Sequence, residues 1–265
     1  MRTPEPKDRL HGFDAVRGLA AVAVVALHAS YAYALFPLPG LVWPVPLDEP
    51  SRLADAAFWW IEGSVMPLFF VLSGYFLARS LARQTPGDVL AGRTRRLLLP
   101  MATVGLAVLA FDLHVWAFGL IATGRATVEH YREMKFPPAI QADLFGPAHL
   151  WYVEYLWLLC GIVCGVTWIM RGLGSDGRVL TPRTPGRSPQ RKGGRAAACG
   201  FAALLVASAA VLLSFHPEVV LGFQHGWLPD PAKFAHAGVF LLLGMLLQRN
   251  GGLTDLTRRL TPLAL

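Results

Sequence analysis

The stretch RGLAAVAVVALHAS, Arg17–Ser30, decides the fold class, because it is apolar along most of the length needed to cross a membrane as a helix. It nevertheless carries a histidine, His28, well inside the apolar run. An ionisable side chain that faces lipid is costly, so such residues usually face the interior of a helix bundle or a watered cavity. The stretch therefore predicts a membrane-spanning helix with one polar face.

The composition of the whole chain supports a membrane protein. Of the 265 residues, 54% are hydrophobic and only 15% are charged, whereas soluble domains carry about 25% charged residues. The formal net charge is +7, but the basic residues lie in short clusters beside apolar runs, which indicates membrane topology and not a nucleic-acid partner. Three cysteines are too few for a disulfide framework.

Six apolar segments are long enough to cross a bilayer. The hydrocarbon core is about 30 Å thick and needs roughly 20 mainly apolar residues per helix. The segments predict an all-α, polytopic bundle that forms one membrane domain in contact with the lipid bilayer. They are 15–36, 56–79, 98–122, 149–170, 196–215 and 232–249.

The loops between these segments differ in charge. Basic residues dominate the N-terminal arm, the stretch before the third segment and the loop 172–194, whereas acidic residues dominate the loops after the first and fifth segments. Because positive charge stays on the cytoplasmic side, both termini are expected in the cytoplasm, in a multi-pass protein of the cell membrane. The loop 172–194 is rich in Gly, Pro and Arg and is predicted to be a flexible basic cytoplasmic loop.

Arg17 and His28 lie on one face of the first predicted helix. Eleven residues separate them, which corresponds to about 20° around a helix and roughly 16 Å along it. A single intramembrane histidine is as often a packing residue, bonded to a neighbouring helix, as a functional one. The aligned arginine favours function.

A cluster of arginines precedes the third predicted segment, in GRTRRLLLP from Gly92 to Pro100. Such a cluster at a membrane surface has an ordinary interpretation as a topology anchor. It also has a functional one, because guanidinium groups grip phosphates through paired hydrogen bonds, and a coenzyme A ester would fit them. The residues concerned are Arg93, Arg95 and Arg96.

Two further stretches place polar side chains in apolar helices: MPLFFVLSGYFLARSLAR, which begins at Met66, and GPAHLWYVEYLWLL, which begins at Gly146. Small residues in the first allow close approach of another helix, and the aromatic residues of the second suit a membrane interface. Glu62, one turn before Met66, is a weaker candidate for lining a cavity. The candidate substrate-binding residues in the two stretches are Ser73, Tyr152 and Glu154.

In order along the chain, the four stretches resemble the acyltransferase 3 family of integral membrane proteins. The shared motifs are an R-G-(apolar)-H helix, an FF-x-x-SG-Y helix, an R-x-x-R cluster before an apolar run with proline, and an HLWY-type helix. The resemblance implies an O-acyltransferase that moves an acyl group, usually acetyl or succinyl, from cytoplasmic acyl-CoA to a hydroxyl of an extracytoplasmic glycan or similar acceptor. No cofactor beyond the acyl-CoA donor is expected.

Carried over by position, the resemblance assigns roles to individual residues. His28, Arg17 and His149 match the catalytic positions, and the arginine cluster matches the donor-binding R-x-x-R. His28 would act as general base or proton relay, or would carry the acyl group covalently, and the sequence leaves this choice open. The histidines lack the spacing of a zinc motif, so no metal site is expected.

The chain is shorter than the family usually is. It stops soon after its sixth predicted span, and we expect the C-terminal part of the family domain to be missing. Two alternatives to the enzyme therefore stay open: an inactive scaffold, and a transporter of a lipid-linked or acylated product. Dependence on acyl-CoA discriminates the enzyme from the transporter, because a transporter is not expected to bind or consume the thioester.

Overall fold

The computed structural model of the chain describes residues 11–36, 38–44, 49–173 and 192–250, and this part contains helices and no strand. The predicted all-α fold class is therefore confirmed. The long helices are α1 (His11–Tyr31), α2 (Arg52–Leu81), α3 (Pro86–Pro100), α4 (Leu106–Ala122), α7 (Trp151–Gly172), α8 (Lys192–Phe215) and α10 (Pro231–Asn250). The short elements are η2 (Met101–Gly105), α5 (Val128–Arg132), α6 (Pro138–Leu144), η3 (Ala148–Leu150) and α9 (Pro217–Val220).

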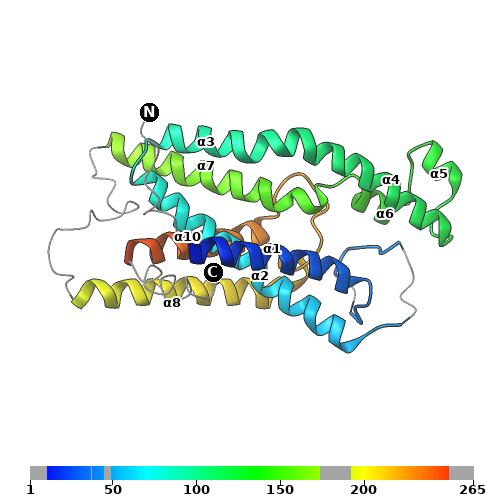
Figure 1. Ribbon diagram of the computed structural model, residues 1–265, viewed down its shortest axis with the longest axis horizontal. Coiled ribbons are helices and arrows are strands. Elements are labelled where there is room, and N and C mark those ends of the chain that lie inside the picture. Colours follow the sequence, from blue (N-terminus) through cyan, green and yellow to red (C-terminus); the bar gives the residue numbers. More distant parts are fainter. Residues whose placement is uncertain (1–10, 37, 45–48, 174–191, 251–265) are drawn as a thin grey trace.

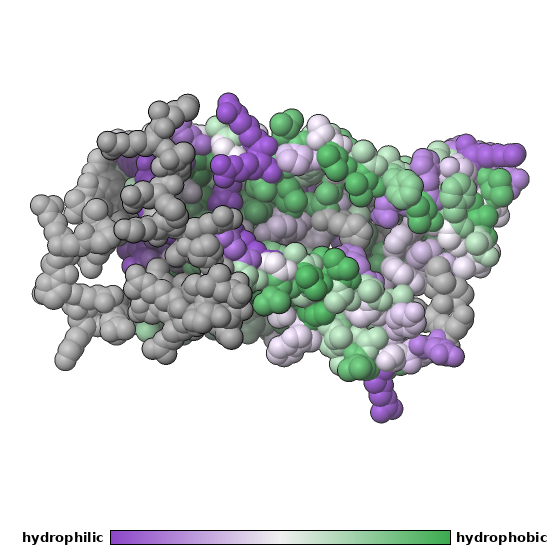
Figure 2. All heavy atoms as spheres, in the orientation of Figure 1, coloured by the Kyte–Doolittle hydropathy of each residue, from purple (hydrophilic) through white to green (hydrophobic). Residues whose placement is uncertain are grey.

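The long helices run along the longest axis of the molecule, side by side, as a membrane bundle requires (Figure 1). In the described residues, 5 helices are long and apolar enough to cross a bilayer, with α3 and α4 counted as one, and α8 adds the shorter apolar helix Cys199–Phe215. Figure 2 shows hydrophobic side chains along the middle of this face and hydrophilic ones at its α5 end. With α3 and α4 taken as one, the successive long helices alternate in direction, so α1 begins and α10 ends toward the same end (Figure 1).

The third predicted segment, 98–122, began too late. The span starts at Pro86 and continues to Ala122, over 37 residues. Thr85 caps its first turn, because its hydroxyl accepts a hydrogen bond from the Asp88 N–H at 3.2 Å, and a proline at the first helical position fits the required backbone angle. The arginine cluster therefore lies on a helix and not in a loop.

Pro100 bends this long span without ending it. A proline inside a helix has no N–H to donate and its ring clashes with the preceding turn. The chain adjusts by forming the π-helical turn η2 directly after the proline and then resumes as α4.

Two other predicted boundaries also shift. The first segment, 15–36, ends at Tyr31, where the chain turns to begin the loop that later covers the cavity. The predicted flexible loop 172–194 lies mostly outside the described residues, but its last residues, from Lys192, already belong to α8.

The tightest packing in the bundle is the crossing of α2 and α10, where two glycines bring the backbones together. A Cβ placed on Gly74 would lie 1.9 Å from the carbonyl oxygen of Leu241, and one placed on Gly244 would lie 1.9 Å from the carbonyl oxygen of Val71. Small residues permit this approach between membrane helices. Leu241 also belongs to the main buried cluster, which α2, α7 and α10 share.

We expect Gly244→Ala to destabilise the folded protein, because no side-chain rotation relieves a contact between a Cβ and a backbone oxygen and the two helices must separate. Gly165→Ala is the matched control, since Gly165 lies on an apolar helix with nothing within 4 Å of its added Cβ. The fraction of detergent-solubilised protein that stays monodisperse after graded heating measures the difference. Equal survival of the two variants would contradict the close crossing.

Candidate functional site

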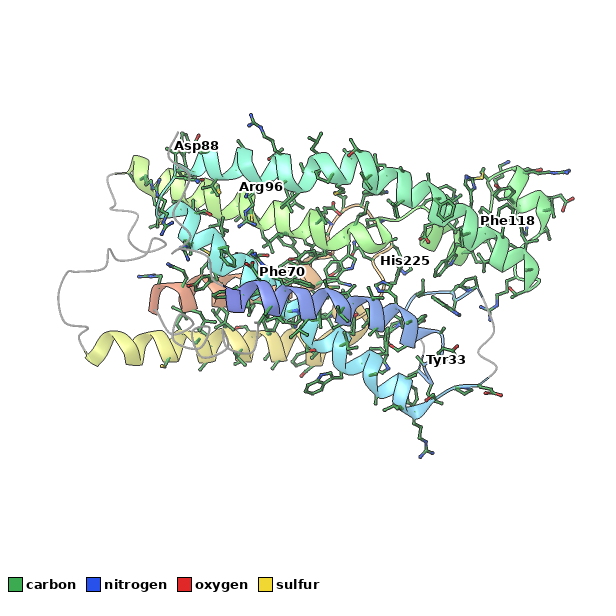
Figure 3. All side chains as sticks on the ribbon, viewed as in Figure 1. Tyr33, Phe70, Asp88, Arg96, Phe118 and His225 are labelled. Atoms are coloured by element: carbon green, nitrogen blue, oxygen red, sulfur yellow. The ribbon has the colours of Figure 1, made fainter. Side chains whose placement is uncertain are left out.

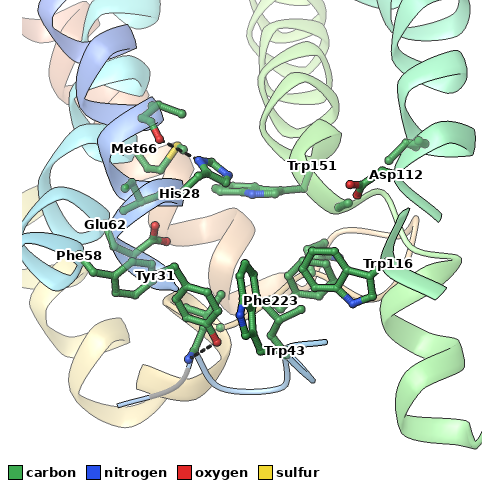
Figure 4. Close-up of a pocket in the computed structure, with 18 of the residues that line it drawn as sticks. His28, Tyr31, Trp43, Phe58, Glu62, Met66, Asp112, Trp116, Trp151 and Phe223 are labelled. Carbon is green, nitrogen blue, oxygen red and sulfur yellow. Dashed lines mark hydrogen bonds between the residues drawn. The ribbon is translucent and has the colours of Figure 1, made fainter. Parts of the chain in front are cut away.

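A cavity of about 240 Å³ lies at the end of the bundle where α1 finishes, with α1 and α2 on one side and α4 and α7 on the other (Figure 4). Rings and ionisable or amide groups share its wall, a combination typical of small-molecule sites. The aromatic residues are Tyr31, Trp43, Phe58, Trp116, Trp151 and Phe223. The polar residues are His28, Glu62, Asp112, Gln224 and Lys233.

The loop after α1 closes one side of this cavity and is tied to two helices. The Tyr31 hydroxyl accepts a hydrogen bond from the Leu38 N–H at 3.0 Å, and the Arg125 guanidinium donates to the Trp43 carbonyl. These bonds hold the loop between the end of α1 and the end of α4. Trp43 thereby reaches the cavity, where its ring packs edge to face on Trp116 at 5.1 Å.

A second loop, between α9 and α10, forms another part of the wall. The Tyr155 hydroxyl of α7 donates to Gln224 Oε1 at 2.9 Å and accepts from the Asp230 N–H at 2.9 Å. Gln224 Nε2 donates in turn to the Gly226 carbonyl at 2.8 Å. Because the polar atoms of the Gln224 side chain are bonded on both sides, this wall has a fixed shape.

His28 lies on the last turns of α1 and its ring points into the cavity (Figure 4). Its Nδ1 lies 2.8 Å from the Val24 carbonyl oxygen. A carbonyl only accepts hydrogen bonds, so in the neutral imidazole Nδ1 carries the hydrogen and Nε2 carries the lone pair. The backbone of α1 therefore selects the tautomer in which Nε2 is the basic nitrogen.

A buried lysine, which the sequence interpretation missed, faces the same cavity. Lys233 is only 4% exposed, and its Nζ donates to the Gly222 carbonyl at 2.6 Å and stands 4.3 Å from the ring centre of Trp151. The Glu62 carboxylate attracts both Lys233 and His28. Three charged or titratable groups, from α1, α2 and α10, therefore face the same cavity.

Two other predicted residues meet between α2 and α7. The hydroxyl groups of Ser73 and Tyr152 lie 3.3 Å apart, which joins α2 to α7. Arg17 and Arg93 both lie close enough to the Tyr152 hydroxyl to interact with it electrostatically. Two predicted substrate residues, Ser73 and Tyr152, are therefore in contact.

Arg17 and His28 are not in contact, although they share a helix. Arg17 lies beside Asp14, with its guanidinium nitrogen 3.9 Å from the carboxylate, and stands 4.2 Å from the ring centre of Phe76. It lines neither of the described cavities. The two residues predicted to share one helix face therefore lie in different surroundings. His28 lines the cavity, whereas Arg17 lies beside Asp14 and Phe76.

The remaining predicted residues stay apart from both groups. Arg95 and Arg96 are exposed on α3. Arg96 lies nearer the end marked by Asp88 than the opposite end, where Tyr33 lies (Figure 3). Glu154 is half-buried and lines no described cavity, and its Oε2 has no hydrogen-bond partner among the described residues. His149 lies in η3, just before α7, and its side chain is outside the described part of the structure.

Comparison with known proteins identifies the family. The acyltransferase domain family Acyl_transf_3 matches residues 10–264, which is nearly the whole chain. The searches of curated proteins and of solved structures found no significant match. The chain therefore belongs to the acyltransferase 3 family, and its apolar helices make it a membrane acyltransferase.

Proposed function

We propose that the protein is an O-acyltransferase of the cell membrane that moves an acetyl or succinyl group from cytoplasmic acyl-CoA to a hydroxyl of an extracytoplasmic glycan or similar acceptor. One observation carries the proposal: a histidine with a fixed basic nitrogen faces a cavity whose wall combines aromatic rings with carboxylates. A hydroxyl acceptor needs a base to remove its proton, and the neutral imidazole of His28 has a nitrogen that accepts one.

The cavity has the chemistry to hold a sugar-like acceptor. Flat rings such as Trp43 and Trp116 offer apolar faces, while Asp112 and Glu62 offer carboxylate oxygens that accept hydrogen bonds from hydroxyl groups. Such contacts hold the reacting hydroxyl near His28 and make the transfer effectively unimolecular.

The proposed reaction proceeds by attack of the acceptor oxygen on the thioester carbonyl carbon. His28 Nε2 accepts the hydroxyl proton while the new C–O bond forms, and the C–S bond then breaks and releases the coenzyme A thiolate, which takes up that proton. Lys233 lines this cavity and is suited to stabilise the negative charge on the carbonyl oxygen. A covalent acyl-histidine is the alternative course.

The donor is proposed to bind through Arg93, which lies on α3. Arg93 is half-buried and interacts electrostatically with Tyr152 and with Cys160 of α7, so its guanidinium faces the bundle. Arg95 is exposed on the same helix. Arg93 therefore fits the phosphates of a bound donor, whereas Arg95 fits the membrane surface.

The test is acyl transfer in membranes that contain the chain. Labelled acetyl-CoA and succinyl-CoA are supplied, and both the label on membrane glycans and the remaining thioester are measured, with membranes that lack the chain as control. Transfer of label supports the enzyme. A thioester that stays intact overturns the proposal. In that case, movement of an acylated glycan across the membrane would identify a transporter. A chain that neither consumes the thioester nor moves the glycan is a scaffold.

Arg93→Gln is expected to raise the KM for acyl-CoA by roughly tenfold or more, because a hydrogen bond between charged groups is lost. Arg95→Gln is the matched control and should leave this KM nearly unchanged. Initial transfer rates at varied donor concentration measure both. If the two variants behave alike, Arg93 has no special place in donor binding.

A further inference from the structure

A second cavity, of about 260 Å³, adjoins the first. It lies between α2, α8 and α10, and its wall includes residues that also line the first cavity. The shared residues are Glu62, Met66, Trp151 and Lys233. The two cavities therefore meet at one wall, which contains the only charged side chains shared between them among the described residues.

Away from this wall the second cavity is almost entirely apolar. Its sides are formed by residues such as Phe70 of α2 and Ala209 of α8, and the exception is His236 of α10. A space of this chemistry accepts hydrocarbon, because burying a methylene away from water is favourable whereas leaving a polar group without partners is costly.

The second cavity opens sideways between α2 and α8. The helix α8 packs on α10 and makes no comparable contact with α2. Gly63 of α2 and Val206 of α8 line the cavity and are exposed, whereas Phe70 and Ala237 are buried at its base. The exposed side of a helix in the middle of a membrane span faces lipid, so the opening is directed toward the bilayer.

We propose that the second cavity binds the alkyl chain of a lipid-borne acceptor whose hydroxyl-bearing head group occupies the first cavity. The chain enters from the bilayer between α2 and α8, and the polar junction between chain and head group lies at the wall of Glu62 and Lys233. This inference rests on the proposed function for the placement of the head group.

An acceptor fits this cavity better than the donor does. None of the described lining residues of the second cavity belongs to α1 or α3, the helices that carry Arg17 and Arg93. A donor held by those arginines contacts helices that do not line the second cavity. The alkyl chain in the second cavity is therefore assigned to the acceptor.

The experiment uses the full chain in lipid nanodiscs and a dodecyl glucoside that carries a photoactivatable diazirine on its alkyl chain. After illumination, mass spectrometry locates the label. We expect label on the lining residues of α2, α8 and α10, with competition by plain dodecyl glucoside and none by glucose. Loss of this pattern, or equal labelling by a diazirine phosphatidylcholine, overturns the proposal, because an ordinary bilayer lipid then accounts for the cavity.

Two glycine-to-leucine substitutions test whether a side chain placed at the opening reduces labelling of the second cavity. Gly63 has nothing within 4 Å of an added Cβ, so Gly63→Leu places a side chain at the opening without a backbone clash. It should reduce labelling by about tenfold, because each displaced methylene contributes roughly fourfold to occupancy. Gly165→Leu makes the same change on α7, also in open space, and should label as the natural chain does.

Two further measurements distinguish the acceptor-chain site from a donor site, and distinguish failure of this site from failure of the proposed function. Labelling of the second cavity by a diazirine palmitoyl-CoA, with no competition from dodecyl glucoside, would assign the cavity to the donor and overturn the inference. His28→Gln should lose acyl transfer and keep the label. A natural chain that transfers acetyl groups without labelling refutes the acceptor-chain site alone, and one that labels without transfer supports the site and refutes the enzyme.

Discussion

Replacing His28 with glutamine should lower the rate of acyl transfer by about 10²- to 10⁴-fold, the usual contribution of a positioned general base. Glutamine has nearly the reach of histidine and donates the same kind of hydrogen bond to the Val24 carbonyl, but its amide has no basic nitrogen. The loss should therefore appear in kcat, with the protein level and the donor KM nearly unchanged.

His114→Gln is the control for this substitution. His114 is exposed on α4, bonds to the Tyr131 hydroxyl at 3.0 Å and lines neither described cavity. Transfer assays on both variants, normalised to the amount of protein in the membrane, give the comparison. If His28→Gln transfers label as fast as His114→Gln does, the imidazole has no part in the chemistry.

An experiment on the unsubstituted enzyme distinguishes the two roles left open for His28, general base and covalent acyl carrier. Rapid quenching after addition of labelled donor, in the absence of acceptor, traps a covalent intermediate if one forms. Label on a peptide that contains His28 would assign the covalent course. An enzyme that transfers label to glycan but never holds it on this peptide uses His28 as a base.

Lys233→Met should destabilise the folded protein by about 1–3 kcal/mol, because it removes the cation that shares a cavity wall with the half-buried Glu62 carboxylate. The Gly222 carbonyl loses its hydrogen bond to Nζ as well. Adding Glu62→Gln should restore part of the loss, since the uncompensated charge is then absent. The double variant should still be inactive if Lys233 stabilises charge during transfer.

Thermal unfolding of the purified protein in detergent measures the four members of this double-mutant cycle, and the coupling is the departure from additivity. Lys135→Met serves as control, because Lys135 and Glu133 form an exposed pair with a separation of 3.9 Å, and such pairs contribute little. Additive effects of Lys233→Met and Glu62→Gln would show that the two residues do not support each other.

The apolar runs were enough to predict the bundle, and one of the predicted site residues, His28, lines the cavity described above. His28 stood out because a titratable ring in an apolar helix needs a polar surrounding, and the structure places it on a cavity. Ser73 and Tyr152 were predicted separately and lie in contact. The start of α3 was missed although its signal was present, since Thr85 and Pro86 followed by Asp88 form a typical helix N-terminus.

Contacts between segments that are far apart in the chain could not be predicted from the sequence. Lys233 is a lone charge near the start of an apolar segment, and nothing in the chain shows that Glu62 lies beside it. Asp112 and Trp43 reach the cavity only because α4 continues past a π-helical turn and a loop is tied to it. Periodicity within one helix predicts which side chains share a face, but it does not predict which other helix packs on that face.

The crossing of α2 with α10 also constrains how the protein is made. Gly74 can pack on Leu241 only after Leu241 has been synthesised, more than 160 residues later. At about 5–20 residues per second, the groove on α2 stays open in the membrane for on the order of ten seconds or longer. During that interval lipid or a membrane chaperone must cover it. Defects at this crossing should therefore show first in cells as proteolysis of newly inserted chains, while the molecules that complete assembly keep their full activity.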